Sequence, residues 1–481
     1  MKKRSLLLTC FFLFFLFLLS LPSCSKSEKN RQIEKENSDL QADKSYSSDQ
    51  SQSLTQSEKT QNAKDAAIKS FVASLEKSVF ISQLFLVNID GSKSFANIER
   101  TGALEGKPEE GEPLLPGGCL LFSFNIADSA QAVSDFIKSI RDFYAKHNIA
   151  APYIAIDQEG GDVNRLRDVT SRLPSQKLIA DYYSLERARE IYSLQASQMK
   201  MLGFDVNLAP VVEAANEENS LFLGTRSFGG IEKTVDFSLA QIEAFAENGI
   251  TSVLKHFPGN TDTDPHSGLP EIKVTRARLK AEYLNPFERL LPESKAVLVS
   301  HARVFVTDDE ARSADSETPV CLSEFWVNEI LRGKLGFDGL VFSDDIFMSA
   351  LSDNGFPPQK AAVLAIQAGV DCIMLSEKRF ASVAKFLLDY AKEDQEFASR
   401  LNEAVCRVIK FKIDAGVLSL IPVHQGENQE NIELEFAVVS SQAAAANSLS
   451  ADAASKEEKT FDAREFEKLF SSGTEALSRF R

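Results

Sequence analysis

The sequence predicts an α/β protein built on a (β/α)8 TIM-type barrel that forms a single large domain. Three observations support this prediction. Short apolar runs recur along most of the chain, longer segments with helical periodicity separate them, and polar residues stand at the ends of several runs. Parallel strands that are buried on both faces have this apolar character, and helices connect them.

The apolar runs lie between about Ala66 and Val417 and are rich in Val, Ile and Phe. Their length and composition are typical of β-strands. We expect eight strands, at 79–87, 119–124, 153–157, 205–210, 251–257, 296–301, 340–345 and 372–376.

Clear helical segments separate several of these runs. Residues 129–148 and 322–336 show the apolar spacing of amphipathic helices, and the second segment closes on Gly336, as a helix end should. Eight strands with intervening helices favour a closed barrel. A doubly wound open sheet is the alternative.

Polar residues at the ends of different predicted strands favour the barrel over the open sheet. These residues are Asp157, Asn207, Lys255, His256, Ser300, His301 and Asp344. In a barrel the carboxyl ends of all strands converge on one mouth, where active sites lie. We therefore expect these side chains to meet.

The first 23 residues resemble a secretory signal. Residues 2–4 are basic and precede an apolar run, Leu6–Leu21, which at about 16 residues is short for a membrane span. The run ends in Leu-Pro-Ser-Cys, which resembles the bacterial lipoprotein cleavage box, so we expect a lipid anchor on Cys24. An ordinary cleaved signal peptide and an uncleaved anchor are the alternatives.

Two segments outside the barrel are predicted to be poorly structured. Residues 24–65 are almost devoid of apolar side chains and should form a disordered tether. The barrel domain should span 66–420. Residues 421–481 read as a low-complexity tail with a possible terminal helix that carries Phe466, Leu469 and Phe470 on one face. We expect that helix to dock on the barrel or to fray, without a catalytic role.

Composition narrows the choice of partners. The net charge of −16 argues against nucleic acid, which requires a basic surface, and fits a neutral ligand. Four cysteines lie beyond Cys24, at 119, 321, 372 and 406, without the spacing of a zinc site or a disulfide framework. We therefore expect buried free thiols, no metal and no cofactor.

Four motifs occur in order along the predicted barrel: "IDQEGG", "GTRSFGG", "KHFPG" with a nearby Asp-x-His, and "LGFDGLVFSDDIFM". Together, over about residues 75–415, they resemble glycoside hydrolase family 3. They most resemble its single-barrel β-N-acetylglucosaminidase branch. The resemblance implies a retaining glycosidase, which needs a carboxylate nucleophile and an acid that protonates the leaving oxygen.

The resemblance assigns the nucleophile to Asp344, the aspartate that directly follows Ser343. Asp345 should then point away, where it could cap the next loop. A structural role for both, as helix caps or ion-pair partners, is the alternative.

The acid in this branch is a histidine held by an aspartate, and Asp264 and His266 supply that pair here. Imidazole can donate and accept a proton near neutral pH. The chain departs from the family pattern in a shorter loop, in Asn260-Thr261 for His-Gly and in Pro265 for Ser. A loop histidine bonded to its own turn is the alternative.

The resemblance also implies five residues that hold the sugar: Asp157, Arg165, Arg226, Lys255 and His256. Ion pairs with a purely structural role are the alternative for each of them. Two further departures are Asp162 where the family has Arg, and Glu213 where it has Asp. His301 could line the pocket or support it from behind.

These observations predict a retaining exo-β-N-acetylhexosaminidase that removes terminal β-linked N-acetylglucosamine, with peptidoglycan fragments as its source. It should be an exported, membrane-anchored lipoprotein on the periplasmic or cell-surface face, and a monomer. A β-glucosidase, a glycoside phosphorylase and a non-catalytic surface lipoprotein are the alternatives.

Overall fold

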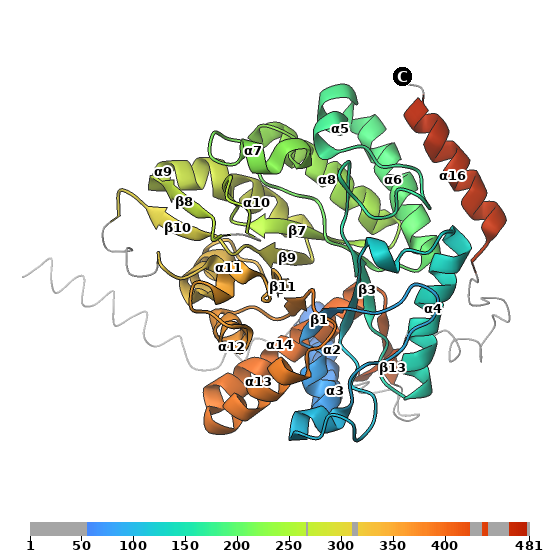
Figure 1. The fold of residues 1–481 in the computed structure, drawn as a ribbon, viewed down its shortest axis with the longest axis vertical. Coiled ribbons are helices and arrows are strands. Elements are labelled where there is room, and N and C mark those ends of the chain that lie inside the picture. Colours follow the sequence, from blue (N-terminus) through green and yellow to red (C-terminus); the bar gives the residue numbers. More distant parts are fainter. Residues whose placement is uncertain (1–54, 266–267, 310–315, 424–434, 441–460, 479–481) are drawn as a thin grey trace, which may run out of the picture. The chain divides into compact units, whose positions relative to one another are not determined.

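The computed structural model of the protein describes residues 55–265, 268–309, 316–423, 435–440 and 461–478. One compact unit spans Lys59–Arg481 and contains a barrel of parallel strands. Its eight-stranded sheet has the order β11-β9-β7-β6-β3-β2-β1-β12. A parallel bridge between Phe342 and Cys372 links the two ends of this order and closes the barrel. The predicted TIM-type barrel is therefore confirmed (Figure 1).

The barrel strands are β1 Phe85–Asn88, β2 Gly118–Leu121, β3 Tyr153–Ile156, β6 Val206–Asn207, β7 Thr251–Phe257, β9 Ala296–Val299, β11 Leu340–Ser343 and β12 Ile373–Leu375. Nearly every position in them is buried, which explains why each strand reads as a continuous apolar run. Short two-stranded sheets lie outside the barrel: β4 Gln158–Gly160 with β5 Val163–Asn164, β8 Glu271–Val274 with β10 Arg303–Val306, and β13 Leu418–Val423 with β14 Glu435–Ser440.

Helices follow most barrel strands and cover the barrel from outside (Figure 1). The α-helices are α2 Gln56–Ser74, α3 Lys77–Ser82, α4 Ala130–Lys146, α5 Gln176–Tyr182, α6 Leu185–Leu202, α7 Ser220–Leu223, α8 Ile231–Glu247, α9 Arg276–Arg278, α10 Asn285–Leu290, α11 Ser349–Ser352, α12 Pro358–Ala368, α13 Ala381–Glu393, α14 Gln395–Asp414 and α16 Ala463–Ser478. The 3₁₀ segments are η2 Thr101–Glu105, η3 Ser123–Asn125, η4 Gly224–Arg226, η6 Leu291–Glu293 and η8 Val320–Leu322, and the π-helical segments are η5 Leu279–Leu284 and η9 Phe325–Lys334.

Both helices that were expected from periodicity form. The hydroxyl of Ser129 accepts the N–H of Ala132 at 3.2 Å and caps α4. The segment 322–336 contains η9, and Gly336 follows it at φ 70°, a conformation that suits glycine.

Side chains fill the barrel interior. The amine of Lys412 lies buried at the end of the barrel where the strands begin. The rings of Tyr153, Phe342 and Phe411 meet edge to face inside the barrel. Lys412 of α14 is fully buried and donates from Nζ to Gln83 Oε1 at 2.7 Å and to the carbonyl of Ala151 at 3.1 Å. Burial lowers the pKa of this amine to about 7.

The first predicted strand, 79–87, was wrong in its first half. Residues 77–82 form α3, and β1 begins only at Phe85. Seven of the nine residues in this run are apolar, and periodicity alone does not separate a buried strand from a short buried helix.

The boundaries of the predicted tether and tail also need correction. Gln56 begins α2, so the end of the segment 24–65 is helical, while residues before 55 lie outside the described ranges. In the tail, β13 pairs antiparallel with β14, from Leu418 opposite Ser440 to Val423 opposite Glu435. The structured part of the chain therefore extends beyond position 420.

The terminal helix α16 docks on the barrel. Phe466 is buried in the same apolar cluster as residues of α4 and α6. The hydroxyl of Ser171 donates to the carbonyl of Phe470 at 3.1 Å, and Arg187 donates to the carbonyl of Ala476 at 2.7 Å. Of the two outcomes expected for the terminal helix, docking on the barrel or fraying, the structure shows docking.

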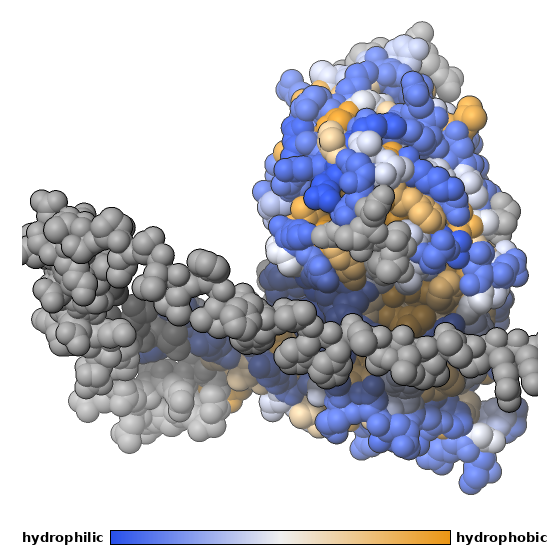
Figure 2. Space-filling view, turned by 90° about the vertical axis from the view of Figure 1, so that its left-hand side faces the viewer, coloured by the Kyte–Doolittle hydropathy of each residue, from blue (hydrophilic) through white to orange (hydrophobic). Residues whose placement is uncertain are grey.

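The surface of the described residues mixes hydrophilic and hydrophobic groups, with hydrophilic ones in the majority on the face shown in Figure 2. Single apolar groups on a surface are ordinary. Within the described ranges, none of the helices combines the length and the apolar character that crossing a membrane requires.

Candidate active site

The carboxyl ends of the barrel strands surround a cavity of about 420 Å³. Its polar lining brings together the proposed nucleophile and all five residues expected to hold a sugar: Asp157, Arg165, Arg226, Lys255, His256 and Asp344. Its apolar lining includes Leu120, Phe122, Phe222, Leu298, Met348 and Met374. A mostly apolar wall with a few convergent polar groups is the usual form of a small-molecule site.

Asp344 follows directly on β11, and only 7% of it is exposed. Its Oδ1 accepts the backbone N–H of Asp345 at 2.8 Å. Burial works to raise the pKa of the Asp344 carboxyl, but the charges of His301 and His256 outweigh it, and the pKa lies below its usual value. The carboxylate is therefore ionised near neutral pH, as a nucleophile must be.

Asp345 partly meets the expectation that it caps the next loop. Its Oδ1 accepts the N–H of Phe347 at 3.0 Å, yet Asp345 also lines the cavity. Burial raises the pKa of this second carboxyl, and hydrogen bonds from Ser376 act against that rise.

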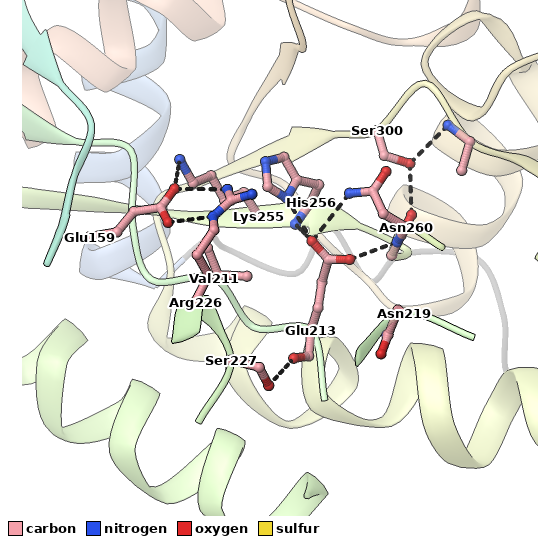
Figure 3. Close-up of polar contacts among 12 residues, drawn as sticks. Glu159, Val211, Glu213, Asn219, Arg226, Ser227, Lys255, His256, Asn260 and Ser300 are labelled. Atoms are coloured by element: carbon pink, nitrogen blue, oxygen red, sulfur yellow. Dashed lines mark hydrogen bonds and ion pairs between the residues drawn. The ribbon is translucent and has the colours of Figure 1, made fainter. Parts of the chain in front are cut away.

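Lys255, the first residue of the KHFPG motif and the fifth of β7, lies between two carboxylates. Its Nζ is 2.6 Å from Asp157 Oδ1 and 2.7 Å from Glu159 Oε1. Glu159 in turn receives two bonds from Arg226, at 2.7 and 2.9 Å (Figure 3). Burial raises the pKa of Glu159, but the charges of Lys255 and Arg226 hold it far below its usual value. Two cations are thus fixed at the cavity by one buried anion.

A second carboxylate, Glu213, organises the neighbouring part of the site (Figure 3). His256 Nδ1 lies 2.6 Å from Glu213 Oε1 and donates to it, since a carboxylate only accepts. The other oxygen accepts the backbone N–H of Asn260 at 2.6 Å, and the amide of Asn260 donates to Oε1 at 3.2 Å. Glu213 therefore orients His256 and also holds the start of the loop after β7.

Arg165 follows β5, and its guanidinium lies 5.9 Å from the centre of the Phe122 ring. Among the described residues, the buried Nε of Arg165 has no hydrogen-bond partner. An unpaired buried donor that lines a cavity is costly unless a ligand or water satisfies it. The prediction that Arg165 contacts the substrate is compatible with this unpaired donor.

The loop that carries the proposed acid reaches the cavity. Asn260 and Pro265 line it, and the carboxylate of Asp262 accepts the N–H groups of Leu221 and Phe222 at 2.9 and 3.0 Å. Asp264 accepts the N–H of Gly268 through its carbonyl at 3.0 Å. His266 lies outside the described residues, so its contacts with Asp264 and with the cavity stay predictions.

Two departures from the family pattern have visible contacts. Asp162 accepts the hydroxyl of Thr225 at 3.0 Å and so links the β4–β5 hairpin to η4, which ends in Arg226. Glu213 has the reach to contact both His256 and Asn260.

His301 is fully buried and lies behind the cavity wall. Its Nε2 is 3.0 Å from the carbonyl of Asp345, and its Nδ1 is 3.1 Å from the sulfur of Cys321. Of the two roles that the sequence left open, these contacts fit support from behind.

The residues that sequence reasoning missed are Glu159, Asn260 and the apolar wall, above all Phe122 and Phe222. Glu159 stands inside a quoted motif, and its position two residues after Asp157 was the available signal. Within the ranges that the structure describes, no group of three His, Cys, Asp or Glu side chains is placed to hold a metal ion.

Comparison with known proteins places these features in a family. The family model described as "Glycosyl hydrolase family 3 N terminal domain" matches residues 108–411. A protein named beta-hexosaminidase from Idiomarina loihiensis is 31% identical over 292 residues, which cover 59% of this chain and 84% of that protein.

Solved structures agree. A glycoside hydrolase family 3 beta-N-acetylglucosaminidase from a Paenibacillus species has a TM-score of 0.62 and 25% identity, with 84% of this chain and 69% of that chain covered. A fungal multi-domain beta-N-acetylglucosaminidase has a TM-score of 0.61 and 27% identity, and this chain covers 39% of it.

The matched region holds seven of the eight barrel strands, from β2 to β12, and every described residue of the proposed site. On these grounds the chain belongs to glycosyl hydrolase family 3 and is a glycoside hydrolase.

Proposed function

We propose that this glycoside hydrolase is a retaining, exo-acting β-N-acetylhexosaminidase that removes terminal β-linked N-acetylglucosamine. One observation carries the proposal: Asp344 shares a single cavity with Asp157, Arg165, Arg226, Lys255 and His256. The names of the relatives, beta-hexosaminidase and beta-N-acetylglucosaminidase, support the choice of sugar. A cavity of about 420 Å³ at the barrel mouth suits one terminal sugar better than the middle of a polymer.

In the proposed mechanism, Asp344 attacks the anomeric carbon and the bond to the leaving oxygen breaks. His266, kept in its protonated form by Asp264, gives that oxygen its proton. The glycosyl ester on Asp344 is then attacked by water, whose proton returns to His266, and the sugar leaves with its original anomeric configuration. The assignment of the acid rests on the loop reaching the cavity at Pro265, one residue before His266.

The charged groups around Lys255 and His256 would hold the sugar. Hydrogen bonds from charged groups to hydroxyls are among the stronger ones, and the ion pairs fix their directions before the substrate arrives. The free Nε of Arg165 offers one more donor, which a hydroxyl or an acetamide carbonyl could satisfy.

A panel of aryl β-glycosides tests the choice of sugar. The full-length protein should hydrolyse the N-acetylglucosaminide at least roughly tenfold faster, in kcat/KM, than the glucoside or the xyloside, which is a transition-state preference of about 1.4 kcal/mol. Each substrate is assayed with and without inorganic phosphate. A preference for the glucoside would make the protein a β-glucosidase, and a sugar phosphate product would make it a phosphorylase.

We further propose that the enzyme acts outside the cytoplasm on peptidoglycan fragments, held to a membrane by a lipid on Cys24. The support is the resemblance of residues 1–24, which lie outside the described ranges, to a lipoprotein signal. Cys24→Ala should move the protein from the membrane fraction to the soluble fraction. Unchanged partition would point to an uncleaved apolar anchor.

A further inference from the structure

The strand ends of β12, β1 and β2 form one side of the barrel mouth, next to the cavity. These three strands are neighbours in the sheet. β2 and β12 give the cavity Phe122, Met374 and Ser376, of which Phe122 and Ser376 lie just beyond the ends of their strands, and β1 runs between these two strands. The same strand ends carry Asp90, Phe124 and Lys378 farther along the chain.

Phe124 extends the aromatic wall to the outside. Its ring centre lies 6.0 Å from that of Phe122, which lines the cavity, yet 57% of Phe124 is exposed. A single exposed apolar group is ordinary by itself, but Phe124 also lies beside the cavity wall at Phe122 and beside the charged group of Lys378. Phe124 therefore offers an exposed aromatic ring next to the cavity wall at Phe122.

The charged groups beside Phe124 complete this surface. Lys378 Nζ lies 5.5 Å from the centre of the Phe124 ring and is ion-paired with Asp90. Both side chains are about half-exposed, at 40% and 44%. We call Asp90, Phe124 and Lys378 the rim platform.

The platform is held rigidly by a buried amide. Asn125 is fully buried, and its Nδ2 donates to the carbonyls of Ile89 and Gly91 at 2.9 and 2.7 Å. Its Oδ1 accepts the N–H of Phe122 at 2.9 Å and the amide of Asn88 at 3.2 Å. All four bonds fix η3, so Phe124 is presented in one place before any ligand binds. Such support from buried hydrogen bonds is typical of binding sites.

We propose that the rim platform is the subsite for the leaving group, and that it binds the second pyranose ring of an oligosaccharide substrate. The carbon-bound hydrogens of a pyranose face would pack on the ring of Phe124. The hydroxyls around the edge of that sugar would bond to Lys378, which donates, and to Asp90, which accepts. An aromatic face flanked by a donor and an acceptor fits a sugar better than a purely apolar group.

This inference rests on the proposed function, because it takes the cavity to hold the terminal sugar. The leaving group must then project out of the cavity through the mouth, past the rim. Substrates with a second sugar should be helped by the platform, and substrates without one should not.

The test compares two substrates that differ only in the leaving group. N,N′-diacetylchitobiose has a second sugar, whereas N-acetylglucosaminyl β-fluoride has a single atom that does not reach Phe124. Phe124→Ala should lower kcat/KM for the disaccharide by roughly tenfold, the size of one lost aromatic contact, and change the fluoride by less than about twofold. The inhibition constant of free N-acetylglucosamine should also stay within about twofold of wild type.

Three further variants sharpen the test. Phe124→Tyr keeps the ring and should restore most of the disaccharide rate. Lys378→Met should lower that rate by roughly threefold, as the loss of one exposed hydrogen bond does. Phe386→Ala removes another exposed phenylalanine, on α13 and not in the cavity lining, and should leave both substrates unchanged.

An equal loss on both substrates in Phe124→Ala, or no loss on either, would overturn the subsite. If the proposed function is wrong, the result is distinct, because the wild-type protein would then hydrolyse neither N,N′-diacetylchitobiose nor the N-acetylglucosaminyl fluoride. In that case the same ratio is measured with the disaccharide and the fluoride of whichever sugar the panel of aryl glycosides selects, so the subsite is still decided.

Discussion

At the scale of single residues, Asp344 shows how the site sets the charge of its nucleophile. The neighbouring positive charges lower its pKa although burial opposes them. Because the folded pKa lies below the unfolded value of about 3.9, ionised Asp344 stabilises the fold above that pH, and this contribution is lost as the pH falls through the folded pKa. Loss of activity between pH 7 and 5 would therefore come from another group.

Asp344→Ala should lower kcat by at least roughly 10³-fold, because the proposed mechanism forms the glycosyl ester on this carboxylate and alanine cannot replace it. The circular dichroism spectrum should not change, since the apolar clusters that hold the strands and helices together do not include this side chain. Near wild-type activity with an unchanged spectrum would assign the nucleophile to Asp345, which lines the same cavity.

His266→Ala should harm substrates according to how badly their leaving group needs a proton. An unactivated disaccharide should lose about 10²–10⁴-fold in kcat/KM, the usual size of general acid–base catalysis. An aryl glycoside with a good leaving group should still form the glycosyl-enzyme, and added azide should rescue its turnover as a β-glycosyl azide. Equal losses on both substrates without rescue would leave His266 a purely structural residue.

The sequence predicted the residues at strand ends better than the residues that hold them. Asp157, Lys255 and Asp344 stand where parallel strands must converge, so their meeting in one cavity follows from the fold. The position of Glu159 between the charged groups of Lys255 and Arg226 could not be predicted in this way. Its contacts with Lys255 and Arg226 depend on the turn between β4 and β5, whose geometry periodicity does not specify.

At the scale of elements, the loop after β7 is tied down from two sides. Glu213 accepts the N–H of Asn260 at its start, and Asp262 accepts two N–H groups at the start of α7. Both anchors lie within six residues of Asp264 and His266 along the chain, and they hold the described part of this loop, up to Pro265, at the cavity.

Glu213→Gln should weaken the anchor at the start of this loop. One oxygen is replaced by an NH₂ group, which would face the donors of His256 or Asn260. We expect kcat/KM to fall by roughly 10- to 100-fold with a rise in KM, and amide hydrogen exchange to increase at 258–264. Asp236→Asn, an exposed carboxylate on α8, serves as the matched control. Faster exchange with unchanged kinetics would mean that the loop's position does not matter to catalysis.

Element types were predicted well where a pattern is long, and poorly where it is short. The helix α4 repeats its apolar face over 17 residues, and its prediction holds. The six residues of α3 carry aromatic and β-branched side chains that suit a strand equally well. The strand β14 was missed because its pairing with β13 is a tertiary contact that the low-complexity surroundings conceal.

At the scale of the whole molecule, the buried amine of Lys412 links pH to stability. Its folded pKa of about 7 lies below the unfolded value of about 10.4. Between these values the unfolded chain binds more protons than the folded one, so the free energy of unfolding rises with pH. Below pH 7 both states are protonated and the full cost of the buried charge is present.

Denaturant unfolding between pH 7 and 9 should therefore show a rise of up to about 1.4 kcal/mol per pH unit from this group. Lys412→Met removes the group and should flatten the rise. Lys410→Met, two residues away on α14 but half-exposed, controls for the loss of a lysine. Parallel curves for wild type and Lys412→Met would show that the amine keeps its ordinary pKa.

Closure of the barrel by neighbouring first and last strands has a consequence for how the chain is made. Phe85 of β1 pairs with Ile373 of β12, so one edge of β1 has no partner until nearly the whole barrel has left the ribosome. Contacts this distant in sequence slow folding, and an open strand edge invites wrong pairing meanwhile. The growing chain should therefore depend on chaperones until the end of β12, at Leu375, has been synthesised and can pair with β1. Polypeptides cut short before that point should be degraded rather than accumulate as partial barrels.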